Sequence, residues 1–164
     1  MAQSIRLKEW LIAAVVLAGI AAGIALAAQA TTDGPLPPPG PAYWSDGDSG
    51  RLADGTKFRL HGIDAPETGS TKQIHGAKCE AERALGYDAK AAVLDLTRGK
   101  DLTVTHDYGH DRYGRLVVDL SVDGHDLSAE LIAGGTHAAW DYDGGQRKPD
   151  WCAPHLPAER LASR

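Results

Sequence analysis

Cysteine is scarce in this chain of 164 residues, which contains only two. That number excludes a small scaffold built on several disulfides and a zinc module with four cysteine ligands. An excess of positive charge is also lacking, because 17 Lys and Arg stand against 22 Asp and Glu. The formal charge of -5 argues against a broad basic surface that neutralises nucleic-acid phosphates. It leaves room for an enzyme that meets phosphate through a few arginines and a bound cation.

One long stretch lacks any charged side chain. Residues 11–28 form an apolar run that, at about 1.5 Å per helical residue, would span about 27 Å, close to a bilayer core. Arg6 and Lys8 precede the run and favour a cytoplasmic N-terminus with an exported remainder. An A-x-A sequence ending at Ala30 is typical of a signal-peptidase site. Residues 1–30 are therefore a signal peptide or a membrane anchor, and the length of the run favours the anchor.

The rest of the chain contains enough apolar residues for one domain, since 43% of all residues are hydrophobic and 24% are charged. Residues 31–42 contain five prolines, which favour extended polyproline geometry and predict a semi-rigid linker. We expect a folded domain over residues 43–146 and a short C-terminal tail over residues 147–164.

The pattern within this domain predicts short strands and two helices. Alternation and turn signals predict strands at residues 51–53, 57–60, 101–107 and 115–122. Helical spacing relates a set of apolar residues before Gly99, namely Ala81, Ala84, Leu85, Ala89, Ala92, Val93 and Leu96. Asp126 or Ser128 can cap a second, short helix that ends at Gly134. Such a β-rich α+β chain suits a small closed barrel such as an OB-fold.

Three short stretches carry the chemistry: residues 46–49 (DGDS), 58–68 (FRLHGIDAPET) and 111–115 (DRYGR). Asp carboxylates and a backbone carbonyl suit Ca²⁺ or Mg²⁺, and Arg suits bidentate contact with phosphate. A metal, a spare carboxylate and two arginines are what in-line hydrolysis of a phosphodiester needs. Each stretch alone is more typical of an ordinary turn, so their joint occurrence is the signal.

In this order, the three stretches resemble the staphylococcal-nuclease-like (thermonuclease) family, over about Asp46 to Trp140. The resemblance implies a five-stranded OB-fold barrel with two or three packed helices and Ca²⁺-dependent cleavage of DNA and RNA. It implies Asp48, Asp64 and the Ala65 carbonyl as metal ligands. The other implied site residues are Glu67 as general base, Arg59 and Arg115 at the phosphate, and Tyr113, Trp140 and Tyr142 at the substrate.

The chain departs from the family after Gln146, where it lacks the apolar repeat of the family's long third helix. Cys79 lies near the start of the first predicted helix and Cys152 lies in the tail. In an exported protein two such cysteines favour a disulfide, which would hold the tail against the helix. Two unpaired thiols remain the alternative.

We expect a monomeric Ca²⁺-dependent nuclease that acts on DNA or RNA after export across the inner membrane. The N-terminal apolar helix would tether it, or cleavage would release a periplasmic or secreted form. A non-catalytic OB-fold module that binds nucleic acid or protein in the cell envelope is the alternative, and a structural envelope protein with bound Ca²⁺ is another. A zinc site formed by His106, Asp107, His110 and Asp111 is less favoured, because the residues around Gly109 predict a loop.

Overall fold

The computed structural model describes residues 35–153. The predicted apolar helix within residues 1–30 lies outside this range, as does the end of the tail. Within residues 35–153, no helix is both long and apolar enough to cross a membrane.

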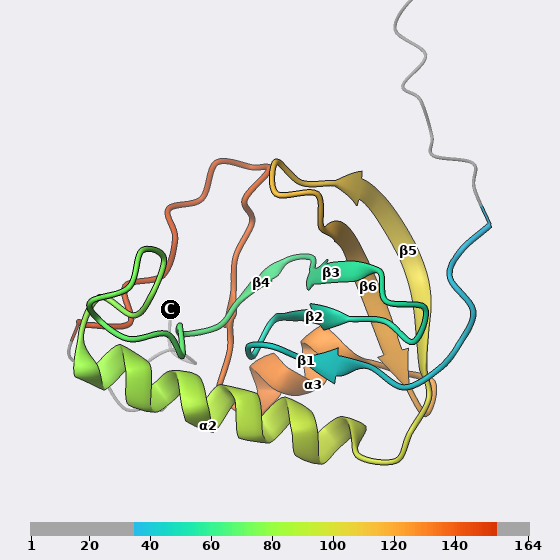
Figure 1. The fold of residues 1–164 in the computed structure, drawn as a ribbon, viewed down its shortest axis with the longest axis horizontal. Coiled ribbons are helices and arrows are strands. Elements are labelled where there is room, and N and C mark those ends of the chain that lie inside the picture. Colours follow the sequence, from blue (N-terminus) through green and yellow to red (C-terminus); the bar gives the residue numbers. More distant parts are fainter. Residues whose placement is uncertain (1–34, 154–164) are drawn as a thin grey trace, which may run out of the picture. The chain divides into compact units, whose positions relative to one another are not determined.

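Most strands of the described domain join one twisted sheet (Figure 1). The strands are β1 (Tyr43–Trp44), β2 (Ser49–Arg51), β3 (Lys57–Leu60), β4 (Ile63–Asp64), β5 (Leu102–His110), β6 (Leu116–Val122), β7 (His125–Asp126) and β8 (Ala138–Ala139). The main sheet has the order β1-β2-β3-β6-β5, and β7 pairs with β6. Only β3 and β6 pair in parallel in this sheet, whereas β4 and β8 form a separate antiparallel pair.

Two helices pack on the sheet, and both are where the sequence predicts them. Helix α2 (Glu80–Thr97) runs along one side of the strands, as Figure 1 shows, and Gly99 follows its end with a φ of 69°. That left-handed conformation favours glycine and ends the helix. Helix α3 (Leu127–Ala133) is capped by Asp126, whose side chain accepts a hydrogen bond from the Ala129 amide at 2.7 Å.

The buried side of α2 differs from the predicted side in its first turns. Ala81 and Ala84 are exposed, and Glu82 and Gly86 are buried in their place. Glu82 is turned inward because its carboxylate accepts a hydrogen bond from the Lys78 amide at 2.6 Å at the start of the helix. The apolar periodicity predicts the helix correctly. Contacts at the start of the helix determine which residues of its first turns are buried.

The hydrophobic core lies between the sheet and the helices. Alternate residues of β6, Leu116, Val118, Leu120 and Val122, are buried, as the period of a half-covered strand requires. Trp44 joins this core, and its indole donates to the Thr97 hydroxyl at 3.1 Å, which links β1 to the end of α2.

The predicted β-rich α+β architecture is confirmed, but the strands do not form a closed ladder within residues 35–153. Between the outer strands, only Gly40 and Leu102 form an isolated bridge, with N···O distances of 3.0 and 2.8 Å. Prolines 35, 37, 38, 39 and 41 surround Gly40 and lack the N–H that a ladder needs. The linker therefore touches the open edge of the sheet without extending it.

Candidate active site

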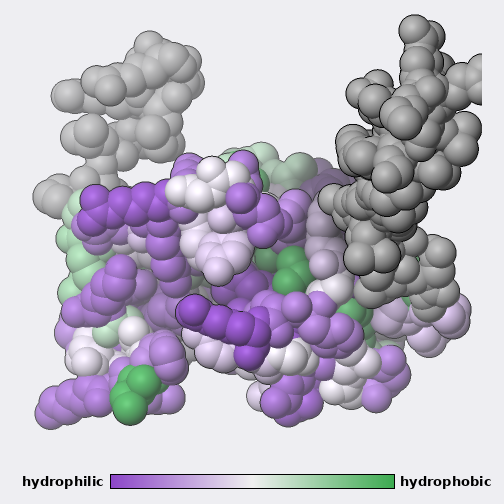
Figure 2. Space-filling view, turned by 90° about the horizontal axis from the view of Figure 1, so that it is seen from above, coloured by the Kyte–Doolittle hydropathy of each residue, from purple (hydrophilic) through white to green (hydrophobic). Residues whose placement is uncertain are grey.

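A cleft of about 660 Å³ lies where β3, the β5–β6 turn and the segment after β8 meet. Figure 1 shows the β5–β6 turn beside the segment after β8, and Figure 2 shows that this face of the molecule is mainly hydrophilic. The residues that line the cleft include all the catalytic and substrate-contacting residues predicted from the sequence: Arg59, Glu67, Arg115, Tyr113, Trp140 and Tyr142. The predicted metal ligands Asp48, Asp64 and Ala65 are buried beside it.

Arg59 joins the two buried aspartates. Pairing of Ser49 with Arg59 between β2 and β3 brings Asp48 against the arginine. The Arg59 Nη2 atom lies 2.9 Å from Asp48 Oδ2 and 3.2 Å from Asp64 Oδ1. Burial disfavours the charged guanidinium, but the two carboxylates outweigh this and hold the pKa of Arg59 above its ordinary value. The guanidinium also lies 5.4 Å from the centre of the Trp140 ring.

Asp64 is completely buried at the end of β4. Its Oδ2 atom accepts a hydrogen bond from the Trp151 indole at 2.8 Å, and Lys148 Nζ lies 3.4 Å from Oδ1. Burial nevertheless raises the pKa of this carboxyl, more than Trp151 and Lys148 lower it. Two residues of the C-terminal tail therefore stabilise the most buried carboxylate of the site.

Glu67 follows Asp64 by three residues, and helix α2 fixes the path of its backbone. A Cβ atom on Gly86 would lie 2.6 Å from the Glu67 carbonyl oxygen, so only glycine allows the helix to cross so closely. The Glu67 carboxylate forms an ion pair with Lys148, whose Nζ atom lies 3.0 Å from Oε1. Burial lowers the pKa of Lys148, but Asp64 and Glu67 raise it further, so the ammonium is charged.

Asp46 adds a carboxylate to this side of the cleft. Burial raises its pKa to about 7, and the charges of Asp48 and Glu67 raise it as well. Next to it, the Gly47 carbonyl accepts a hydrogen bond from His137 Nε2 at 3.0 Å, which requires a proton on that nitrogen. Burial lowers the pKa of His137, consistent with a neutral ring that holds the loop after β1 in place.

Arg115, across the cleft, is positioned within its own turn. Its guanidinium forms two contacts with Asp111 Oδ2, at 2.7 and 2.8 Å, and lies 5.4 Å from the centre of the Tyr113 ring. Burial raises the pKa of Asp111, but hydrogen bonds from Arg115 and Tyr113 outweigh this and hold it below its ordinary value. This arginine and its carboxylate are only four residues apart.

Lys148 and Trp151 are the site residues that the sequence analysis missed. Both come from the tail, and a disulfide between Cys79 and Cys152 joins that tail to the start of α2. The nearby cysteine is the one sequence feature that could have directed attention to them. Their contacts with Asp64 depend on residues more than 80 positions apart in the chain, which no local pattern encodes.

Residues 35–153 contain no group of three or more His, Cys, Asp or Glu side chains arranged to hold a metal ion. In particular, the alternative zinc site does not form, because Asp107 accepts the Gly109 amide and Asp111 pairs with Arg115. The carboxylates near Arg59 have the oxygen donors that Ca²⁺ prefers, and the pKa values of Asp46 and Asp64 are raised first by burial and then by neighbouring carboxylates. They fit a hard cation chemically, and the assignment of the individual ligands stays a prediction.

The segment of the chain that forms most of the cleft matches a known protein family. Residues 57–155 match the family model described as "Staphylococcal nuclease homologue". The chain belongs to this family. The resemblance found in the sequence is thereby confirmed for the segment from β3 to the disulfide, which includes Arg59, Asp64, Glu67 and Arg115. Asp46 and Asp48 precede the matched residues.

Two curated relatives are similar to part of this chain. "Probable staphylococcal-like nuclease CAN1" of Oryza sativa subsp. japonica is 34% identical over 99 residues, which are 60% of this chain and 25% of the relative. The "Uncharacterized 38.1 kDa protein" of Capnoides sempervirens is 34% identical over 98 residues, which are 60% of this chain and 24% of that protein. The match thus spans about a quarter of the length of each relative.

Proposed function

We propose that this protein is a nuclease that hydrolyses phosphodiester bonds of DNA, RNA or both with the help of Ca²⁺. Membership of the staphylococcal nuclease homologue family suggests nuclease activity. The observation that carries the assignment is the shared cleft, which brings Arg59 and Glu67 of one stretch together with Arg115 of a distant one. A carboxylate and two arginines in one cleft are suited to activate water beside a phosphate.

Each side chain then has a defined role. Glu67 accepts the proton of the attacking water, while Arg59 and Arg115 bind the phosphate oxygens and stabilise the charge that develops on them. Asp48, Asp64 and the Ala65 carbonyl would hold Ca²⁺, which when bound supplies further electrostatic stabilisation. Trp140 and Tyr142, whose ring centres are 5.4 Å apart, offer surfaces on which bases can stack without strong sequence preference.

A cleavage assay tests this function. The purified protein is incubated with end-labelled DNA and RNA, in parallel with Ca²⁺ and with a chelator. We expect shortened products with Ca²⁺ and none with the chelator. Full activity in chelator would remove Ca²⁺ from the mechanism. Binding of either nucleic acid without any cleavage would instead support the non-catalytic binding module.

We further propose that the domain works outside the cytoplasm. The disulfide between Cys79 and Cys152 is of a kind that persists in oxidising compartments, and the apolar run before residue 30 is suited to export. A C-terminal fusion to a reporter enzyme that is active only after export should be active. A mature form that begins at Thr31 would show a cleaved signal rather than an anchor, and an inactive reporter would contradict export.

A further inference from the structure

We propose that Lys148 is a positioning residue that holds Glu67 and Asp64 in their working geometry, and that the Cys79–Cys152 disulfide keeps it there. This inference rests on the proposed nuclease function and deepens it. It gives the tail a role in the reaction in addition to its role in stability. We name residues 147–153 the C-terminal strap.

The strap contacts both carboxylates from one side. Lys148 Nζ lies 3.0 Å from Glu67 Oε1 and 3.4 Å from Asp64 Oδ1, while Trp151 donates to Asp64 Oδ2 at 2.8 Å. Arg59 reaches the same Oδ1 atom from the side of β3. Both oxygens of Asp64 are thus held, and Lys148 is the cation that the structure places directly between Asp64 and Glu67.

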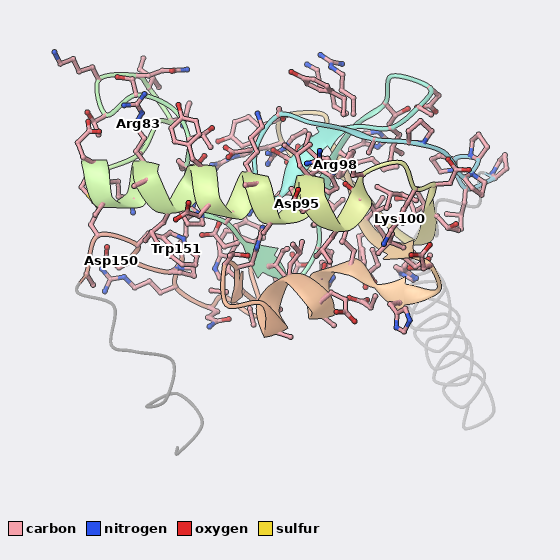
Figure 3. The ribbon with its side chains drawn as sticks, turned by 90° about the horizontal axis from the view of Figure 1, so that it is seen from below. Arg83, Asp95, Arg98, Lys100, Asp150 and Trp151 are labelled. Carbon is pink, nitrogen blue, oxygen red and sulfur yellow. A yellow bond between two sulfur atoms is a disulfide. The ribbon has the colours of Figure 1, made fainter. Side chains whose placement is uncertain are left out.

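Both ends of the strap are anchored. Before it, Gln146 forms backbone and side-chain hydrogen bonds with Asp141, at 2.9 and 2.7 Å, and its carbonyl accepts the Trp140 indole at 2.9 Å. After Trp151, Cys152 is joined to Cys79, the capping residue of α2. Figure 3 shows Asp150 and Trp151 beside the first turns of α2. Loss of the disulfide removes the covalent anchor at the C-terminal end of the strap.

The electrostatics explain why this cation matters for geometry. Asp46, Asp48, Asp64 and Glu67 crowd one side of the cleft, and the charges of Asp48 and Glu67 act on Asp46. Without Lys148, Glu67 would lose its 3.0 Å partner, and Arg59 would be left to balance the repulsion from the neighbouring carboxylates. A general base that is displaced by about 1 Å can cost a large factor in rate. We therefore expect the turnover number to suffer and substrate binding to change little.

The decisive variants are Lys148→Met, which approximates the length of the side chain but removes its charge, and Lys148→Arg, which keeps the charge. Lys100→Met is the matched control, because Lys100 has a similar exposed fraction and pairs with Asp123 at 2.9 Å, beyond the opposite end of α2 (Figure 3). We expect Lys148→Met to lower kcat about tenfold with KM within about twofold. Lys148→Arg should recover most of the loss, and Lys100→Met should cleave at the wild-type rate.

A double-mutant cycle separates positioning from a general structural effect. If Lys148 acts through Glu67, Lys148→Met should lower the residual activity of a Glu67→Gln protein by less than about twofold. An undiminished tenfold loss in that background would overturn the inference. A wild-type kcat for the Lys148→Met single variant would also overturn the inference. An increased kcat would overturn it too, because it would show that Lys148 inhibits the reaction.

The disulfide provides an independent arm. Reduction by a dithiol converts the bond to two thiols while the dithiol becomes a disulfide, and Cys79→Ser with Cys152→Ser gives the same break without a reductant. Both should lower kcat about as much as Lys148→Met, and adding Lys148→Met should then change little. Thermal melts confirm that the proteins compared are folded at the assay temperature. Wild-type kcat after reduction would contradict the role of the disulfide, whereas a wild-type protein that cleaves nothing would contradict the proposed function itself.

Discussion

The two arginines that line the cleft are held in opposite ways. Arg59 contacts Asp48, which directly precedes β2, and Asp64 at the end of β4, in a region where burial raises the pKa values of Asp46 and Asp64. Arg115 contacts Asp111 within one turn, and that carboxyl has a lowered pKa. On the Arg59 side the carboxyl groups of Asp46, Asp48, Asp64 and Glu67 lie near two cations, Arg59 and Lys148. On the other side, Arg115 pairs with the single carboxylate of Asp111. The difference indicates where an added cation would relieve repulsion.

The largest expected effect is at Glu67, which belongs to the crowded side. Glu67→Gln keeps the shape of the side chain but removes the basic carboxylate, so kcat should fall by about 10²–10⁴. Steady-state kinetics with labelled DNA measure it, and a melt with an unchanged midpoint serves as the control for folding. A wild-type rate would exclude Glu67 as the base.

The next effect compares the two arginines directly. Arg59→Lys and Arg115→Lys keep the charge but lose the planar fork, so each should lower kcat by about 10² if both stabilise the transition state. Arg59→Lys should also lower the melting temperature, because Arg59 joins two buried carboxylates, whereas Arg115→Lys should hardly affect it. Equal melting temperatures for the two variants would contradict the difference between the two sides.

The smallest effect concerns the carboxylates, in protein kept free of metal by a chelator. The folded-state pKa of Asp46 is raised to about 7, so ionised Asp46 destabilises the fold and stability should decline as pH rises toward and through 7. Asp46→Asn should remove this decline and add about 1–2 kcal/mol above pH 7, less than full linkage because the group is partly exposed.

Asp111 should behave with the opposite sign. Its lowered pKa means that the ionised form stabilises the fold above the unfolded-state pKa, and this stability is lost as pH falls through the folded-state value. Asp111→Asn should therefore destabilise the protein at neutral pH, by about 1 kcal/mol or less. Denaturant unfolding at several pH values checks both variants, and the same sign for both would break the comparison.

Local patterns are enough to predict much of this molecule. Alternation in β6 and helical spacing in α2 and α3 identify these elements, because each buries one face. The site residues from Arg59 to Glu67 and Arg115 can be predicted because these stretches, taken together, resemble the staphylococcal-nuclease-like family. The local patterns do not predict the open edge of the sheet. It arises because β1 has only two residues and the proline-rich segment before it cannot extend the pairing toward β5.

The tail shows what the sequence does not encode locally. Nothing in the residues around Lys148 indicates that its ammonium lies against Glu67, because a disulfide across 73 positions and the packing of Trp151 bring it there. The pKa shifts of Asp46 and His137 also cannot be predicted from local sequence, because burial in the folded domain is their largest cause. Motifs predict which residues react, whereas tertiary contacts determine which neighbours tune them.

The central claim is that two differently built halves of the cleft act on one phosphate. It is tested most directly by the cleavage rate of the Arg59→Lys/Arg115→Lys double variant beside both single variants, with the same labelled DNA and Ca²⁺. When two residues stabilise one transition state as a unit, the double variant loses less cleavage rate than the product of the two single-variant fold-losses. We predict a combined loss well below that product. Losses that multiply would show that the arginines act independently and would contradict the account.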